Sequence, residues 1–125
     1  MKLYRVMKLA ADGKPLIGRR RNMLGVRPTD PANRDPKRTP DVQAVNDADL
    51  VSPGEGLSTS TDRDALNRRV GKGEAVFEID PDQLDADLNA RLDRGDHWLI
   101  EPSWPMTLMV YQQVLAGTRD LWKQV

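Results

Sequence analysis

Hydrophobic and polar residues alternate at the start of the chain. In residues 2–9, Leu3, Arg5 and Met7 fall on one side of an extended backbone and the even-numbered residues on the other. A period of two predicts a β-strand. Arg5 is therefore expected on the same side of this strand as two large apolar residues.

The pattern weakens after this strand. An Asp-Gly turn signal at residues 12–13 precedes residues 14–17, which are expected to begin a partner strand. Residues 25–56 contain five prolines and few large apolar residues, so they predict a long loop with one short helical turn near residues 42–46. A loop of this length in a compact domain is usually functional or disordered.

Regular patterns return in the second half of the chain. Thr61 is expected to cap a helix over residues 62–70, with Leu66 and Val70 facing the core. Residues 74–80 alternate and are rich in residues that favour strands, so they predict a strand. A further strand is expected at residues 97–100, which are mostly apolar.

Two more helices are expected in this half. Asp80-Pro81 is a helix-start signal, and it is followed by Leu84, Leu88 and Leu92 at a spacing of four, with Gly95 as the stop. A last helix is expected to begin at residues 103–105 and to carry its core residues on one face: Leu108, Tyr111, Leu115 and Trp122. The order of elements predicts an α+β fold. No glycine-rich phosphate motif follows the first strand, so a dinucleotide-binding Rossmann fold is not favoured.

Composition limits what this fold can be. With 125 residues and 38% hydrophobic content, the chain is expected to form one domain, residues 1–125, with 25–56 as an extended loop. It has no cysteine and one histidine, which excludes thiolate chemistry and disfavours a metal site. No apolar run approaches the length of a membrane span, so no membrane partner is expected. Residues 1–8 lack the apolar core of a signal peptide, which predicts a cytoplasmic protein or one exported without a cleaved signal.

Charge is distributed unevenly although the net charge is zero. Residues 14–38 carry eight basic and two acidic side chains, whereas residues 39–125 carry eight basic and sixteen acidic ones. The two parts can simply attract each other in the fold. Alternatively, the basic segment 14–38 makes the chain a non-catalytic interaction module that binds nucleic acid or an acidic partner.

The candidate chemistry centres on Ser58-Thr59-Ser60. These three hydroxyls stand at a predicted strand end close to Gly56, after Arg5 and before the only histidine, His97. Taken singly, Arg5 can pair with acidic residues, the hydroxyls can form a cap and turn, and His97 can be structural. Taken in order, they predict a ligand-binding cleft.

Several short motifs together resemble a known family. They are Leu3-Tyr4-Arg5, Gly56-Leu57-Ser58-Thr59-Ser60 with Asp62-Arg63, Val76-Phe77-Glu78-Ile79, His97-Trp98-Leu99-Ile100 and Pro105-Met106. In these features the chain resembles the ADP-ribosyltransferase fold, and more narrowly the small effector toxins that bacteria deliver by type VI secretion. The resemblance implies a split sheet, NAD as cofactor, action in the cytoplasm of a target cell, a macromolecular target, and a cognate immunity protein or antitoxin.

The resemblance also implies roles for the site residues. Arg5 would contact the NAD phosphates, with Tyr4 beside it, and Ser58, Thr59 and Ser60 would line the nicotinamide pocket. The catalytic set would be His97, Ser58 and Thr59, and the reaction would be ADP-ribosyl transfer or NAD hydrolysis. His97 stands where the family has a glutamate, so when neutral it can accept a hydrogen bond from a ribose hydroxyl, but it adds no negative charge. A related RNA phosphotransferase is less favoured, because Arg5 is followed by Val6 rather than by that family's histidine.

Overall fold

The central feature of the structure is an antiparallel sheet of six strands. The computed structural model describes all 125 residues and orders this sheet β5-β6-β3-β1-β4-β8. The strands are β1 (Leu3–Lys8), β3 (Leu57–Ser60), β4 (Glu74–Ile79), β5 (Leu88–Arg94), β6 (His97–Pro102) and β8 (Lys123–Gln124). A second, two-stranded sheet pairs β2 (Leu50–Val51) with β7 (Met106–Thr107). The α+β class predicted from the sequence is confirmed.

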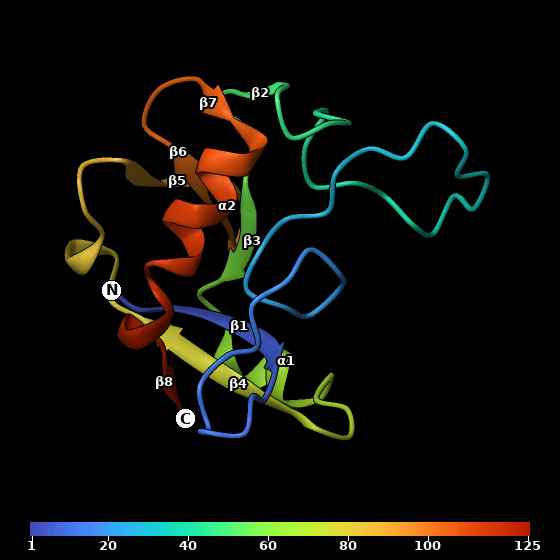
Figure 1. Cartoon of the computed structure of the whole chain (residues 1–125). Helices are drawn as coiled ribbons and strands as arrows, with labels where there is room; N and C mark the ends of the chain where they lie inside the picture. Colours follow the sequence, from blue (N-terminus) through green and yellow to red (C-terminus); the bar gives the residue numbers. More distant parts are fainter.

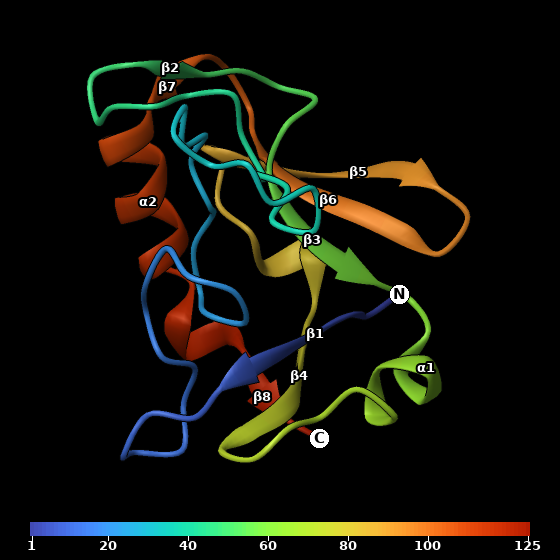
Figure 2. The same ribbon diagram turned by 90° about the vertical axis from the view of Figure 1, so that its right-hand side faces the viewer.

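The large sheet consists of two arms that meet at β1 and β3. These two strands share a single register pair, Tyr4 with Ser60, whereas β1 and β4 are paired along their full length. Figure 2 shows the β5-β6-β3 arm and the β1-β4-β8 arm running in different directions from this junction. The junction therefore lies next to the three hydroxyls of Ser58 to Ser60.

The inner face of the sheet is covered by α2 (Leu108–Ala116), which crosses in front of β3 in Figure 1. Leu108, Tyr111 and Leu115 are fully buried and pack against inner-face residues of β1, β3, β4 and β6. Residues 9–56 connect β1 to β3 and are irregular apart from β2; we call them the long irregular segment. They contribute five residues to the same core: Leu24, Val26, Val42, Ala44 and Val51. This segment is thus part of the core despite its many prolines.

The outer face carries α1 (Arg63–Asn67), which lies against β1 and β4. Val6 and Val76 are register partners on this face and are both buried. The cap of α1 is Asp62, whose carboxylate accepts the Ala65 N–H, and not Thr61 as predicted. Val70 lies beyond the helix and is exposed, so its predicted place in the core was wrong.

The predicted helix after Asp80 was the largest error in the sequence interpretation. Asp80 does cap a turn, but only the single 3-10 turn η1 (Pro81–Gln83) forms. Leu88 and Leu92 lie instead on β5, which pairs with β6 through a hairpin that turns at Gly95, where φ is +53°. A spacing of four is even, so it also places residues on one face of a strand. The pairing with β6 decided between the two structures.

Smaller differences occur elsewhere. Residues 14–17 form only isolated bridges, Leu9 with Pro15 and Ile17 with Leu24, and no strand. Residues 42–46 form no helical turn.

The last helix begins at Leu108 rather than at residues 103–105, because Met106 and Thr107 pair with β2 first. Trp122 is buried as expected but follows the second 3-10 turn, η2 (Arg119–Leu121). The strands predicted at 2–9, 74–80 and 97–100 are confirmed.

No helix of the structure has the length and apolar character needed to cross a membrane.

Candidate functional site

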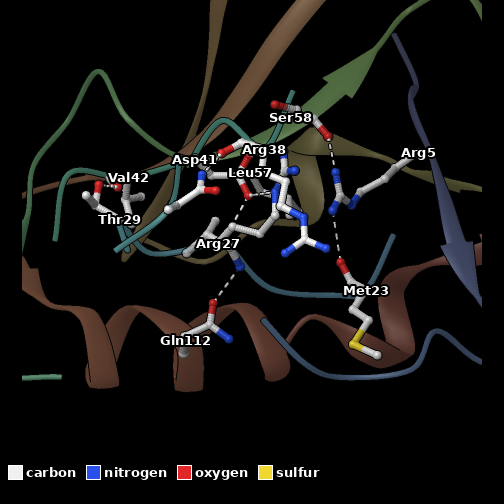
Figure 3. A network of polar contacts seen from close by, with 12 residues as sticks. Arg5, Met23, Arg27, Thr29, Arg38, Asp41, Val42, Leu57, Ser58 and Gln112 are labelled. Carbon is white, nitrogen blue, oxygen red and sulfur yellow. Dashed lines mark hydrogen bonds and ion pairs between the residues drawn. The ribbon is translucent and has the colours of Figure 1, made fainter. Parts of the chain in front are cut away.

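Arg5 lies in the middle of β1 and points to the inner face, as its alternation with Leu3 and Met7 predicted. Its Nη1 donates to the Ser58 carbonyl (2.9 Å) and its Nη2 to the Met23 carbonyl (3.0 Å), as Figure 3 shows. The Nε is buried and has no partner. The guanidinium thus ties β1 to β3 and to the segment before Val26.

Burial lowers the pKa of Arg5 to about 10, against the opposing attraction of Asp41. Arg27 also lowers this pKa by repulsion. The guanidinium remains charged at neutral pH, because its pKa is still about three units above it. Arg5 is therefore a fixed positive charge inside the sheet, held by two main-chain oxygens.

The three hydroxyls next to Arg5 have different surroundings. Thr59 is buried on the inner face (4% exposed), and its Oγ1 donates to the Trp98 carbonyl at 3.0 Å. Ser60 faces outward, and its Oγ accepts the Asp62 N–H at 3.0 Å at the start of α1. The Ser58 side chain has no hydrogen-bond partner within the protein. Thr59 and Ser60 therefore stabilise the local structure, and Ser58 keeps a free hydroxyl.

His97 begins β6 on the outer face, opposite Ser60. Its Nδ1 lies 2.7 Å from Oδ2 of Asp93, and its side chain is 37% exposed. A carboxylate can only accept, so Nδ1 carries the proton in this contact. A neutral His97 then has an unprotonated Nε2 that can accept a proton. No pattern in the sequence pointed to Asp93, which reaches His97 because the β5–β6 register shifts between Leu92 and Arg94.

The register places three of the predicted residues in one row across three adjacent strands. Tyr4 on β1 is the partner of Ser60 on β3, and Ser60 is the partner of His97 on β6. Register partners in antiparallel strands share a face and stand close together. We refer to Tyr4, Ser60 and His97 as the outer row. It combines an aromatic ring, a hydroxyl and an imidazole that contacts a carboxylate.

The structure does not bring all the predicted site residues to this row. Arg5 and Thr59 point to the inner face, whereas Tyr4, Ser58, Ser60 and His97 point to the outer face. Successive residues of a strand point to opposite faces, so the guanidinium and the imidazole are separated by the sheet. The predicted residues therefore form two groups on opposite sides of β3.

A hollow lies outside this site, in the long irregular segment. It is a cleft of about 1100 Å³ with no hydrophobic lining. Its lining includes six cations: Arg19, Arg20, Arg21, Arg27, Lys37 and Arg38. The charge excess of residues 14–38 left two alternatives open, attraction to the acidic part of the chain or a basic binding segment, and neither included a cleft. Arg27 in the cleft and the buried Arg5 share an acidic neighbour. The Arg27 Nε lies 3.3 Å from the Asp41 carboxylate, and the charge of this carboxylate also attracts Arg5.

No group of three or more histidine, cysteine, aspartate or glutamate side chains that could hold a metal ion occurs in the structure.

Comparisons of the chain with protein-family models, with curated proteins and with solved structures find no match.

Proposed function

We propose that this chain is an effector toxin that binds NAD and breaks its bond to nicotinamide, passing the ADP-ribose group to a macromolecular target or to water. The observation that carries this proposal is the outer row, in which Tyr4, Ser60 and His97 are register neighbours and His97 contacts Asp93 at 2.7 Å. The sequence resemblance to ADP-ribosyltransferase-like toxins supports the same proposed function.

The outer row, together with Ser58 on the same face of β3, fits the nicotinamide-ribose end of NAD. The Tyr4 ring offers a flat apolar surface, the free Ser58 hydroxyl offers a hydrogen bond, and His97 offers a base. The contact between Arg5 and the phosphates that the resemblance implies requires the guanidinium to exchange its two main-chain acceptors for phosphate oxygens. While those bonds hold, Arg5 supports the site by fixing the Ser58 carbonyl.

The proposed reaction requires two groups from the protein, a base and a nearby negative charge. NAD supplies an ADP-ribose group with nicotinamide as the leaving group, which departs with the electron pair of the broken carbon–nitrogen bond. His97 Nε2 takes the proton of the attacking hydroxyl. Asp93 holds the imidazole in the required tautomer and adds the negative charge that histidine lacks, which favours a developing positive charge nearby.

The test is expression of the chain in a bacterium while growth, cellular NAD and free nicotinamide are followed. The wild-type chain is expected to arrest growth, and His97→Ala and Ser58→Ala are expected to relieve the arrest. Ser52→Ala is the matched control, because Ser52 is exposed and its side chain has no partner. A fall in NAD indicates hydrolysis, and labelled ADP-ribose on a macromolecule indicates transfer.

The same proposal predicts that co-expression of a cognate immunity protein restores growth. Purified, folded chain that neither binds NAD nor releases nicotinamide from it, alone or with cell extract, would overturn the proposal.

A further inference from the structure

The cationic cleft is built by two stretches of the long irregular segment, residues 19–21 and residues 27–40. Figure 1 shows the second stretch as a loop that stands away from α2 and from the sheet. Six cations and two carboxylates, Asp30 and Asp35, line the cleft. The cleft is therefore strongly basic in a chain whose net charge is zero.

Half of the cations in the cleft have no partner. Three of the six are paired: Arg19 with Asp47, Arg27 with Asp41, and Arg38 with Asp35. The side chains of Arg20, Arg21 and Lys37 are exposed and make no ion pair and no hydrogen bond. The alternative that the basic segment is neutralised by the acidic part of the chain thus accounts for Arg19 and Arg27 but not for these three.

The basic surface continues beyond the cleft. Arg21 also lines a smaller hollow of about 350 Å³, together with Lys8 and Arg69. The side chains of Lys8 and Arg69 likewise have no partner. Glu74 in this hollow is already used, since its carboxylate accepts from Asn22 (2.7 Å) and from the Gly71 N–H (2.9 Å). Five free cations therefore line two hollows joined at Arg21.

The lining chemistry identifies the kind of ligand. The core of a protein interface is apolar and rich in aromatic residues, and a groove for single-stranded nucleic acid stacks bases on aromatic rings. The cleft has neither, because no aromatic or large aliphatic side chain lines it. Arginine forks and free ammonium groups bind phosphate oxygens well.

We infer that the cationic cleft binds the phosphate backbone of a nucleic acid without reading its bases. Phosphate contacts from lysine and arginine supply affinity that does not depend on sequence and that falls steeply with salt. This inference goes beyond the proposed NAD chemistry and does not depend on it, because none of the five free cations belongs to the outer row.

The test compares two triple variants of equal net charge. Arg20→Gln/Arg21→Gln/Lys37→Gln removes the free cations of the cleft. Arg63→Gln/Arg94→Gln/Lys123→Gln removes three exposed, unpaired cations that line neither hollow. Binding of fluorescent RNA and DNA duplexes is measured by anisotropy at several salt concentrations, and thermal unfolding confirms that each variant is folded.

The cleft variant is expected to lose about tenfold or more in affinity at low salt, and its plot of log affinity against log salt is expected to be shallower by about one unit for each lost phosphate contact. The control variant is expected to stay within about threefold of the wild type, because its cations lie outside the hollows. Unrelated duplex sequences are expected to bind alike.

Three results would overturn the inference. One is no binding of the wild-type chain to either duplex at low salt. Another is an equal loss in the two triple variants, which would show that only net charge matters. The third is a wild-type chain that binds polyglutamate but neither duplex, together with a cleft variant that no longer binds polyglutamate. That result would assign the cleft to an acidic protein.

Discussion

Glu101 is the residue whose replacement tests the architecture of the site most directly. Its side chain is 3% exposed on β6 and joins three segments. Oε1 accepts the Gly54 N–H (2.8 Å) and the Arg91 Nε–H (2.6 Å), and Oε2 accepts from Asn89 (2.9 Å). The carboxylate thus fixes the turn that leads from Gly54 into β3 and its three hydroxyls.

Glu101→Gln is expected to lower the free energy of unfolding by about 2 kcal/mol. Glutamine keeps one oxygen for the Gly54 and Arg91 donors, but both bonds lose the negative charge that strengthens them, and hydrogen bonds to charged groups contribute about 1.5–3 kcal/mol each. Glu101→Ala leaves a main-chain N–H without its acceptor, so a larger loss of about 3–5 kcal/mol is expected. Urea unfolding at pH 7 measures both.

The effect of Glu101→Gln depends on pH in a predictable direction. Burial alone would raise the pKa of Glu101, but hydrogen bonds from Asn89, Gly54 and Arg91 outweigh burial and hold this pKa below its usual value. Its stabilising contribution is therefore complete above the unfolded-state pKa of about 4.3, and it is lost as pH falls through the lower folded-state pKa. The gap in stability between the wild type and Glu101→Gln is expected to shrink in acid.

The control is Glu78→Gln on β4, because the Glu78 carboxylate has no partner in the structure. It is expected to change the free energy of unfolding by less than about 0.5 kcal/mol at any pH. The reasoning would be refuted by equal effects of the two substitutions at pH 7, or by a Glu101→Gln effect of the same size at pH 7 and in acid.

Three further substitutions test the contacts around β3 by urea unfolding. Arg5→Lys is expected to cost about 1–3 kcal/mol, because one ammonium cannot reach both carbonyls that the guanidinium holds; unchanged stability would contradict this geometry. Tyr111→Phe is expected to cost about 3 kcal/mol, since it leaves a buried N–H and a buried carbonyl unpaired; a loss below about 0.5 kcal/mol would count against it. Gly56→Ala places a Cβ 2.4 Å from a β6 carbonyl oxygen, whereas in Gly117→Ala the nearest atom is 3.2 Å away. Gly56→Ala is therefore expected to lower the free energy of unfolding more than Gly117→Ala does. Similar losses of stability in the two variants would show that β3 can shift to make room.

Local pattern predicted the strands that alternate strongly, and it misassigned residues 81–94 for a physical reason. Leu84, Leu88 and Leu92 fit one stripe of a helix, but four is also an even number, so they equally fit one face of a strand. What selects the strand is its pairing with β6, which begins three residues after β5 ends. The choice depends on a partner, and a pattern read within one segment does not contain it.

The composition of the site was more predictable than its arrangement. The alternation of Arg5 with Leu3 and Met7 already placed Arg5 on the core side of its strand. Whether His97 shares that side depends on the register across β3, which joins Tyr4 to Ser60 and Ser60 to His97. Register between strands that are far apart in sequence is fixed by packing, so the separation of Arg5 from His97 emerged only from the structure.

The charge excess of the long irregular segment can be counted in the sequence, but the cleft depends on the conformation of the segment. Its conformation is held by side-chain bonds to the main chain: Asp41 accepts the Arg27 N–H (2.7 Å), Thr29 donates to the Val42 carbonyl (2.9 Å), and Gln112 accepts the Val26 N–H (2.7 Å). Figure 3 shows the first two bonds within the segment and Gln112 on α2 accepting from its main chain. Buried Val26 and Val42 pack into the core on either side of residues 27–41. Because these anchors are single contacts rather than a periodic pattern, no sequence period predicts them, yet they hold the segment so that its free cations face one cleft.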